Sequence, residues 1–469
     1  MKSAAALLCA AVLGACAVVQ PLQAPTHSVE VPPAWAAAEM AGAHTAAADD
    51  GSLFAWWDRF GDAQLASLVR AALLTNASAN AAQAALQQAQ AHRDVVAAVM
   101  WPQLGTSASA QRSRATGQST GNRFQVALDA NWLPDLFGGM RSAVAAGDAA
   151  VEASAASLGD LRVQLAAEVA LNYLLLRTAQ ARLAIAISNL VSQQETLLIT
   201  RWREQAGLVT ALESAQADAA VAQTAALLPT LETNIRQTQH ALAVLTGAPP
   251  AALLASLSAV MPVPQVDDDL ALTIPADTLR QRADVRAAEF QVLAARAQVD
   301  QAEAQRWPSL ALGGSLGVSA ASVGALTNGA SVLASLLASV SLPVLDGGAA
   351  RAGVRVQQAA LSQAEQRYRA AVLTALKDVE NALVALRGDR LRLARQRVAA
   401  DAAAVAAVLA RQRYSTGLVD FQTVLETQRT QLSAQDGLAS AGADVSADHV
   451  RLFTALGGGW RNDRVEARQ

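Results

Sequence analysis

The chain has 469 residues, of which 52% are hydrophobic, 4% aromatic and 16% charged. Alanine is dense in runs such as 402–410. Because alanine is the best helix former but adds little volume, this composition favours long, closely packed helices over a thick enzyme core. A net charge of −3 removes the electrostatic argument for nucleic-acid binding, and two cysteines in the whole chain exclude a disulfide scaffold or a cysteine zinc cluster.

The N-terminus has the form of a secretory signal. Lys2 precedes an apolar stretch at 4–12, which is followed by Leu13-Gly14-Ala15-Cys16. That tetrapeptide resembles the bacterial lipobox, so residues 1–15 are predicted to be a signal peptide and Cys16 the lipid-bearing first residue of the mature chain. An ordinary signal peptide that happens to contain a cysteine is the alternative. Residues 16–55 carry four prolines among small residues, which predicts a lipidated N-terminal linker.

After this linker the chain repeats itself. Three landmarks recur in the same order at nearly constant offsets of 206, 209 and 210 residues. A tandem duplication is therefore predicted, with a first repeat at 56–250, an inter-repeat linker at 251–278, a second repeat at 279–461 and a C-terminal tail at 462–469. The landmarks are Trp101-Pro102-x-Leu104 with Trp307-Pro308-x-Leu310, Pro134-Asp135-Leu136-Phe137-Gly138-Gly139 with Pro343-Val344-Leu345-Asp346-Gly347-Gly348, and Arg203-x-x-x-Gly207-Leu208 with Arg413-x-x-x-Gly417-Leu418.

Each repeat contains two segments in which apolar residues alternate with small or polar ones. The alternation is strict at 123–132 and 309–318 and looser in the partner segments at 104–111 and 331–341. Such alternation over about ten residues is typical of a transmembrane β-strand, although a hairpin of a soluble sheet can show it too. The uncharged stretch 307–345 has the length of a transmembrane helix, but its glycines argue against a continuous one. Four strands cannot close a barrel and lipid does not tolerate open edges, so membrane strands would require oligomerisation.

The remaining segments have a seven-residue apolar period typical of coiled coils. The stretch 143–202 would form a helix of roughly 90 Å, which is too long for an ordinary helical-bundle core. Pro229 should kink the helix that returns. Gly207 and Gly417 lie where each outgoing helix should end. Each repeat is therefore predicted to hold a long antiparallel helical hairpin with its tip at the Gly-Leu pair.

Motifs for catalysis or metal binding are weak. The five histidines have no i, i+4 pairing, so each is expected to be a solvated surface residue, and no metal or cofactor is predicted. The segment 313–317 matches Gly-x-Ser-x-Gly, but a nucleophile elbow needs a strand before the serine and a helix after it. The glycines at 457–459 lack the Gly-Lys-Ser of a phosphate loop. The sequence thus predicts that the protein is not an enzyme. The histidines are His27, His44, His92, His240 and His449.

Further motifs accompany the repeats. They are Trp57-Asp58-x-Phe60-Gly61-Asp62-x-x-Leu65, Trp132-x-x-Asp135-Leu136-Phe137-Gly138, Leu242-Ala243-Val244-Leu245-Thr246-Gly247, Arg282-Ala283-Asp284-Val285-Arg286, Tyr414-x-x-Gly417-Leu418-x-Asp420-Phe421 and Ala455-Leu456-Gly457-Gly458-Gly459-Trp460. With the lipobox and the landmarks, they resemble the outer-membrane efflux lipoproteins of the TolC family, NodT-like branch, which serve RND-type tripartite pumps. The resemblance covers nearly the whole mature chain. Leu133 and Gly139 depart from the family's usual glutamate and basic residue at the junction between strand and helix.

The resemblance implies a mainly α-helical fold with a transmembrane β-barrel. A homotrimer would combine four strands per protomer into a twelve-stranded barrel, and the helical hairpins into a coiled-coil tunnel of twelve helices. The implied location is the outer membrane of a Gram-negative bacterium, where lipid and barrel anchor the protein and the tunnel lies in the periplasm. The implied partners are a periplasmic adaptor and an inner-membrane pump.

The function that follows from this resemblance is passive conduction of small molecules, such as drugs, to the exterior. The outlet of a type I protein-secretion system is the runner-up, and a structural coiled-coil lipoprotein without a pore is the alternative outside the channel class. The resemblance also implies a periplasmic gate at Asp420, for which a solvated helix N-cap is the alternative. Adaptor docking is expected at the two tips, for which plain C-caps with a structural leucine are the alternative. The docking residues are Arg203, Gly207, Leu208, Arg413, Gly417 and Leu418.

Overall fold

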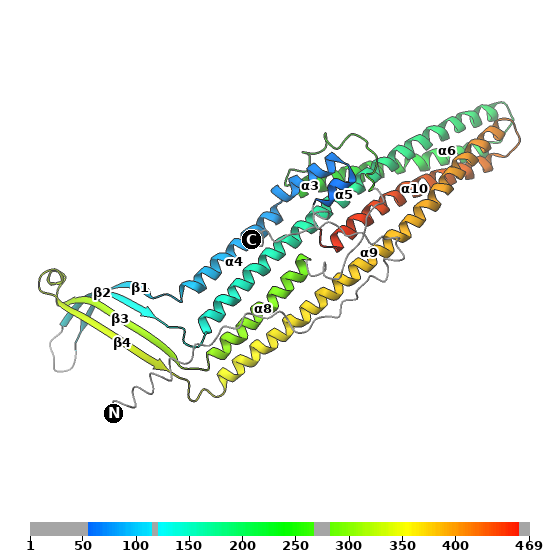
Figure 1. Cartoon of the computed structure of the whole chain (residues 1–469). Coiled ribbons are helices and arrows are strands. Elements are labelled where there is room, and N and C mark those ends of the chain that lie inside the picture. Colours follow the sequence, from blue (N-terminus) through cyan, green and yellow to red (C-terminus); the bar gives the residue numbers. More distant parts are fainter. Residues whose placement is uncertain (1–54, 115–120, 267–281, 459–469) are drawn as a thin grey trace. The chain divides into compact units, whose positions relative to one another are not determined.

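The computed structural model describes residues 55–114, 121–266 and 282–458 (Figure 1). Cys16 lies outside the described residues. The chain forms two compact units, each of which draws on both halves of the sequence. The sheet unit contains Ala84–Ala155 and Arg286–Ala371, and the helical unit contains the other described residues.

The order of elements repeats once along the chain. A helix, two strands and long helices at α4–β1–β2–α5–α6–α7 are followed by the same plan at α8–β3–β4–α9–α10. The two longest helices, α5 and α9, have 67 residues each, or about 100 Å. The elements are η2 (Trp56–Phe60), α3 (Ala63–Thr75), α4 (Ala77–Ala98), β1 (Gln103–Ser113), β2 (Gly121–Trp132), α5 (Gly139–Gln205), α6 (Ala211–Ala225), α7 (Leu227–Leu245), α8 (Ala283–Ala304), β3 (Ser309–Ala320), η4 (Gly324–Leu326), β4 (Ser331–Ser341), α9 (Ala349–Ser415) and α10 (Phe421–Ala455).

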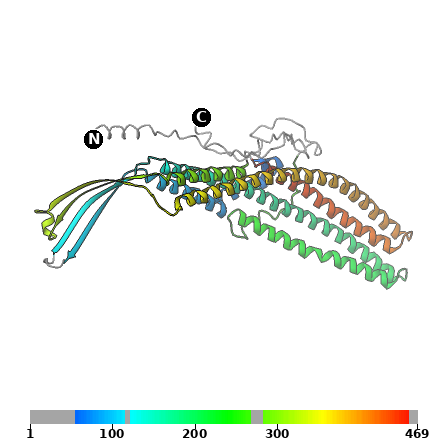
Figure 2. The same cartoon turned by 90° about the horizontal axis from the view of Figure 1, so that it is seen from below.

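The four strands form one antiparallel sheet in the order β1-β2-β3-β4 (Figures 1 and 2). The stretch 307–345 is thus a strand pair and not a transmembrane helix, as its glycines indicated. Within this sheet β1 and β4 each pair on one side only. Because directly paired residues project from the same face, the register divides the sheet into an apolar and a polar face.

The returning helix of the first repeat is divided at Ala226, three residues before Pro229. Proline has no N–H to donate to the carbonyl four residues earlier, which is that of Ala225, the last residue of α6. The kink predicted at Pro229 is therefore confirmed. In the second repeat α10 continues without a break for 35 residues.

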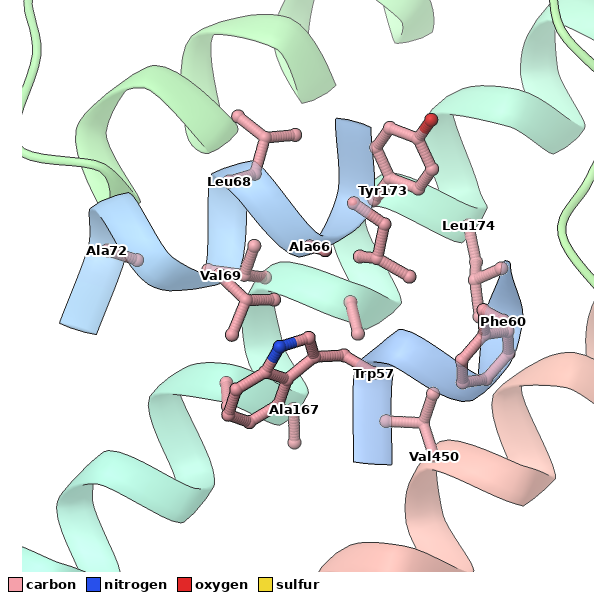
Figure 3. Close-up of a cluster of buried hydrophobic side chains, with 14 of the residues drawn as sticks. Trp57, Phe60, Ala66, Leu68, Val69, Ala72, Ala167, Tyr173, Leu174 and Val450 are labelled. Atoms are coloured by element: carbon pink, nitrogen blue, oxygen red, sulfur yellow. The ribbon is translucent and has the colours of Figure 1, made fainter. Parts of the chain in front are cut away.

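The largest hydrophobic cluster of the helical unit surrounds the short elements η2 and α3 (Figure 3). Trp56 is fully buried, and its ring stacks on that of Phe453 with centroids 5.5 Å apart and planes inclined by 16°. Figure 3 shows Leu68 and Val69 of α3, Trp57 and Phe60 of η2 and further apolar side chains around them. The aromatic side chains supply volume that alanine-rich helices lack. This cluster fastens the N-terminal part of the first repeat to α5 and α10.

A buried arginine lies beside this cluster. Arg177 of α5 is 0% exposed, and its Nη1 donates to Gln180 Oε1 at 2.7 Å and to the carbonyl oxygen of Ala259 at 2.6 Å. Its Nη2 donates to the hydroxyl of Tyr173 at 3.0 Å, and that hydroxyl donates to Asp62 Oδ2 at 2.7 Å. Burial is the main cause that raises the pKa of Tyr173 to about 12. The network ties the extended segment after α7 to α5 through charge-assisted hydrogen bonds.

The structure corrects the expectation that every histidine is a solvated surface residue. His449 of α10 is 1% exposed, with Nδ1 2.8 Å from the carbonyl oxygen of Val445 and Nε2 3.3 Å from Arg390 Nη2. A ring that donates from Nδ1 to a carbonyl presents an acceptor at Nε2, so this geometry favours neutral histidine. The heptad pattern identifies the apolar residues of this face, but it does not show that α9 supplies a hydrogen-bonding partner for a buried imidazole.

The residue before His449 is also buried. Asp448 is 1% exposed, and its Oδ1 accepts a hydrogen bond from Arg451 Nη1 at 2.6 Å. Its Oδ2 is buried and has no hydrogen-bond partner among the described residues. Burial is the main cause that raises the pKa of Asp448 to about 6; the hydrogen bond from Arg451 opposes this shift, and the nearby carboxylate of Asp389 adds to it. Folding therefore shifts the protonation equilibrium of Asp448 toward the neutral acid, which predominates only below about pH 6.

This raised pKa predicts a specific dependence of stability on pH. Between about pH 4 and pH 6 the folded state binds the proton of Asp448 more tightly than the unfolded state does, so the contribution of this group to stability is full at low pH and is lost as the pH rises. Asp448→Asn imitates the protonated form and should raise the free energy of unfolding at pH 7.5 by up to about 3 kcal/mol, with the gain vanishing near pH 4.

The measurement is the thermal unfolding midpoint by circular dichroism in detergent between pH 4 and pH 8. Asp444→Asn is the matched control, since this neighbouring carboxylate is 44% exposed and pairs with Arg392. It should not stabilise the protein at pH 7.5. An Asp448→Asn variant whose midpoint stays at or below that of the wild type at every pH would contradict the raised pKa of Asp448.

Candidate functional site

The tip of the first helical hairpin is a closed C-cap. Gly207 adopts φ 71°, and the N–H of Leu208 donates to the carbonyl oxygen of Arg203 at 2.8 Å. The N–H of Gly207 donates to the carbonyl oxygen of Glu204 at 2.8 Å, which completes a Schellman motif. The prediction that Gly207 ends the outgoing helix is confirmed.

The second tip has the same backbone and a different cap on the helix that follows. Gly417 adopts φ 80°, and the N–H of Leu418 donates to the carbonyl oxygen of Arg413 at 2.8 Å. Asp420 is the N-cap of α10, since its Oδ1 accepts hydrogen bonds from Thr423 N at 2.9 Å and Thr423 Oγ1 at 2.5 Å. These bonds hold the pKa of Asp420 below its usual range. Asp420 therefore caps the N-terminus of α10 within a single chain.

The two tips are held together by an arginine and a tyrosine. Arg203 Nη1 donates to the carbonyl oxygen of Tyr414 at 2.7 Å, and the guanidinium carbon lies 4.5 Å from the centre of the Tyr414 ring. The ring of Tyr414 packs in turn on that of Phe421, 5.6 Å away. Leu197, Ala217, Ala220, Ala410, Val424 and Leu425 complete this buried cluster.

The predicted docking residues do not all have the same environment. The structure brings Arg203 into contact with the other tip, whereas Arg413 is an exposed side chain. The reason is visible in the duplication, because Glu204 stands in the first repeat where Tyr414 stands in the second. Sequence reasoning missed this contact, although that difference between the repeats was a signal for it.

The leucines of both tips are open to solvent in the single chain. Leu208 is 69% exposed and Leu418 is 75% exposed, and neither belongs to the cluster around Tyr414. An added Cβ at Gly207 or Gly417 would meet no atom within 4 Å, so the surface beside each leucine is open backbone. Each tip therefore leaves a large apolar side chain in solvent beside an exposed turn.

The other end of interest is where the strands meet the helices. The ring of Phe137 stacks on that of Trp307 at 5.6 Å, and Trp132 Nε1 donates to the carbonyl oxygen of Met100 at 3.0 Å. Trp101 is 73% exposed although it is large and apolar. Aromatic side chains of this kind concentrate at the interface between membrane and water. In the segment between β2 and α5, Asp135 Oδ2 accepts hydrogen bonds from the backbone N–H of Arg141 at 2.9 Å and from its Nε at 3.2 Å.

Nothing in the described part of the chain offers a metal centre, since no group of three or more histidine, cysteine or acidic side chains lies close enough to hold an ion there. Ser315 of the Gly-x-Ser-x-Gly match lies within β3 and donates to or accepts from Ser335 Oγ at 2.7 Å. No helix follows it, so the geometry of a nucleophile elbow is missing at this serine.

Comparison with known proteins agrees with the architecture. The model of the family described as outer membrane efflux protein matches residues 68–248 and 274–458. Nodulation protein T of Rhizobium leguminosarum bv. viciae is 32% identical over 419 residues, which cover 89% of this chain and 87% of that protein. Outer membrane protein OprJ of Pseudomonas aeruginosa is 32% identical over 475 residues, which cover 98% and 96%. The solved structure of the outer-membrane channel OprN matches with a TM-score of 0.85 and 32% identity over 94% of this chain and 100% of that one.

The left-handed glycines of the tips predict a large difference between two otherwise equal substitutions. Gly417→Ala should lower the free energy of unfolding by about 1–2 kcal/mol, because a Cβ at φ 80° clashes with its own backbone. Gly353→Ala, inside α9 with equally open space around its Cβ, should raise it by about 0.5–1 kcal/mol. Urea unfolding of both variants measures the difference, and equal effects would contradict the role of φ at the tip.

Proposed function

Because the chain belongs to the outer membrane efflux protein family, we propose that it is the exit duct of a tripartite efflux pump, which passively conducts small molecules and carries out no catalysis. Relatives of this chain are outer-membrane components of efflux pumps, and the protein is an outer-membrane efflux channel. The observation that carries the proposed mechanism is a sheet with one apolar face and two unpaired edges, followed by two helices, α5 and α9, of about 100 Å each.

The assembly that follows is a homotrimer. The free edges of β1 and β4 expose backbone groups that lipid cannot satisfy. Pairing of β4 of one chain with β1 of the next closes a ring, and three chains supply twelve strands. The same rotation would place three helical hairpin pairs around one axis, which gives a tunnel of twelve helices.

The proposed anchor is double. Cys16 would carry lipid at the mature N-terminus, which its lipobox supports. One acyl signal alone holds a protein weakly, so the apolar face of the barrel supplies the second and stronger membrane contact. The domain boundaries expected from the duplication, with repeats at 56–250 and 279–461, remain part of the proposal.

The partners proposed for this channel are a periplasmic adaptor, which docks on the tips, and an inner-membrane pump behind it. The exposed leucines Leu208 and Leu418 support the tips as the docking site, and Arg203, Gly207, Arg413 and Gly417 shape it. The export of small molecules is favoured over type I protein secretion because pyoverdine export and toluene efflux proteins are among the relatives.

The tips provide the experiment that tests this function. In a host that has the pump and adaptor but no other channel, the wild-type protein should raise the minimum inhibitory concentration of an exported drug. The double variant Leu208→Asp, Leu418→Asp should abolish that increase, because two charges replace exposed apolar contacts.

Leu74→Asp is the matched control, since Leu74 is an equally exposed leucine, at 77%, in α3. Light scattering in detergent should give a trimer for all three proteins. Full drug resistance in the double variant would leave the tips as plain C-caps, whereas a monomeric wild type would contradict the channel itself.

The proposed gate at Asp420 allows a separate measurement. In a trimer three such carboxylates would face one axis, and a carboxylate ring favours cations. Asp420→Asn keeps the N-cap, because asparagine caps as well as aspartate, and should reduce cation selectivity in planar bilayers. Asp420→Ala removes both roles and should also destabilise α10 by about 1 kcal/mol. Unchanged selectivity in an intact Asp420→Asn trimer would leave Asp420 as a cap only.

A further inference from the structure

The two faces of the sheet have sharply different chemistry. On one face the register joins Val126 to Val318 and Leu128 to Leu316, with the apolar residues of β4 beside them. The opposite face has serine, glycine, alanine and glutamine at most positions. Since apolar side chains face lipid in a membrane barrel, the opposite face lines the lumen.

The lumen face holds few charges. Arg123 and Asp129, both on β2, are the charged residues on this face within the four strands as described. They are six positions apart, or about 20 Å along the strand. That separation exceeds the Debye length of about 10 Å at 0.1 M salt, so the two charges act on a passing ion separately.

Asp129 is surrounded by small residues on the neighbouring strands. Its paired neighbours are Gly105 on β1 and Ser315 on β3, and Ser315 pairs in turn with Ser335 on β4. Ser107 Oγ on β1 donates to Asp129 Oδ2 at 2.6 Å, which holds the carboxylate close to the sheet. Asp129 has no cationic partner among the described residues, so its charge is available to a molecule in the lumen.

Two leucines interrupt the small, polar character of this face. Leu333 and Leu337 flank Ser335 on β4 and are 44% and 64% exposed. Their β3 partners are glycines, Gly317 and Gly313, so each leucine stands above its surroundings. Two strand spacings separate Ser335 from Asp129, or about 10 Å. One surface thus presents a carboxylate and an apolar pair at the separation of the two ends of a small amphiphile.

We propose that the lumen face of β2–β4 is a transit site for amphiphilic cations, in which Asp129 attracts the charge and Leu333 and Leu337 receive the apolar group. This inference rests on the proposed channel, because it requires that this face line a pore. A weak contact of this kind concentrates a substrate in the lumen and still allows it to leave. Anions of the same size gain the apolar contact but are repelled by the like charge of the Asp129 carboxylate.

The test uses small, water-soluble probes that differ in one property at a time. Benzyltrimethylammonium and benzenesulfonate are both aromatic and have opposite charges, whereas tetramethylammonium keeps the positive charge and lacks the ring. Each is added to the extracellular side of wild-type channels in planar bilayers at low salt, and the reduction of current gives its blocking affinity. Benzyltrimethylammonium should block more strongly than either of the other two.

The variants separate the two contributions. Asp129→Asn should weaken block by benzyltrimethylammonium about five-fold and remove its advantage over benzenesulfonate. The double variant Leu333→Ser, Leu337→Ser should remove its advantage over tetramethylammonium and keep the preference for cations. Leu336→Ser, on the same strand but on the lipid face, should change neither.

The salt dependence gives a second signature. The effect of Asp129→Asn should fade toward 1 M salt, where the Debye length is about 3 Å, while the effect of the leucine variant should persist. Two results would overturn this inference and leave the channel intact. One is a conducting wild-type channel that the three probes block equally, and the other is an Asp129→Asn channel that benzyltrimethylammonium blocks as strongly as the wild type. Trimers that conduct no ions at all would overturn both.

Discussion

The backbone of an edge strand in lipid is the constraint on which the structure depends. Every N–H and C=O in the hydrocarbon layer needs a partner, and β1 and β4 each have a free side in one chain. Four strands with a shared apolar face can therefore exist in a membrane only as part of a closed ring. A single chain therefore cannot satisfy its own edge strands, and the symmetry of the closed ring also applies to the helices that continue from it.

The helices are poor in bulky residues. Alanine adds little volume, so α5 and α9 approach neighbouring helices closely but gain little burial for each residue. Two clusters of large apolar side chains lie in the helical unit, one around Trp56 and one around Tyr414. The first cluster fastens η2 and α3 to the long helices, and the second joins the two tips. The length of the helices, and not the thickness of a hydrophobic core, sets how far apart the two clusters lie.

Much of the fold could be predicted because apolar residues recur regularly, every second position in the strands and with a seven-residue period in the helices. The partner strand 331–341 has the bounds that its sequence pattern indicated, and β3 and the long helix α5 extend only a few residues beyond the expected stretches. Gly207, Gly417 and Pro229 mark helix ends and a kink through backbone chemistry alone, so they needed no tertiary information.

What could not be predicted is polar and depends on the partner helix. The burial of Arg177 requires the carbonyl oxygen of Ala259, which is 82 positions away, in addition to the hydroxyl of Tyr173 one turn earlier on the same helix. His449 resembled a surface residue in sequence because Arg390 is 59 positions away. A periodic pattern shows which face of a helix is buried, but it does not show which donor a distant element brings to that face.

The duplication also shows where the side chains of the two repeats differ. Two repeats with helices of equal length give each protomer two similar halves, so a trimer would have a backbone with nearly six similar sectors. The side chains divide these sectors into two kinds. β2 carries Arg123 and Asp129, whereas β3 and β4 carry no charge, and Tyr414 replaces the Glu204 of the first repeat. The repeated backbone accounts for closure of the ring, and the residues that differ between the repeats make the two kinds of sector chemically distinct.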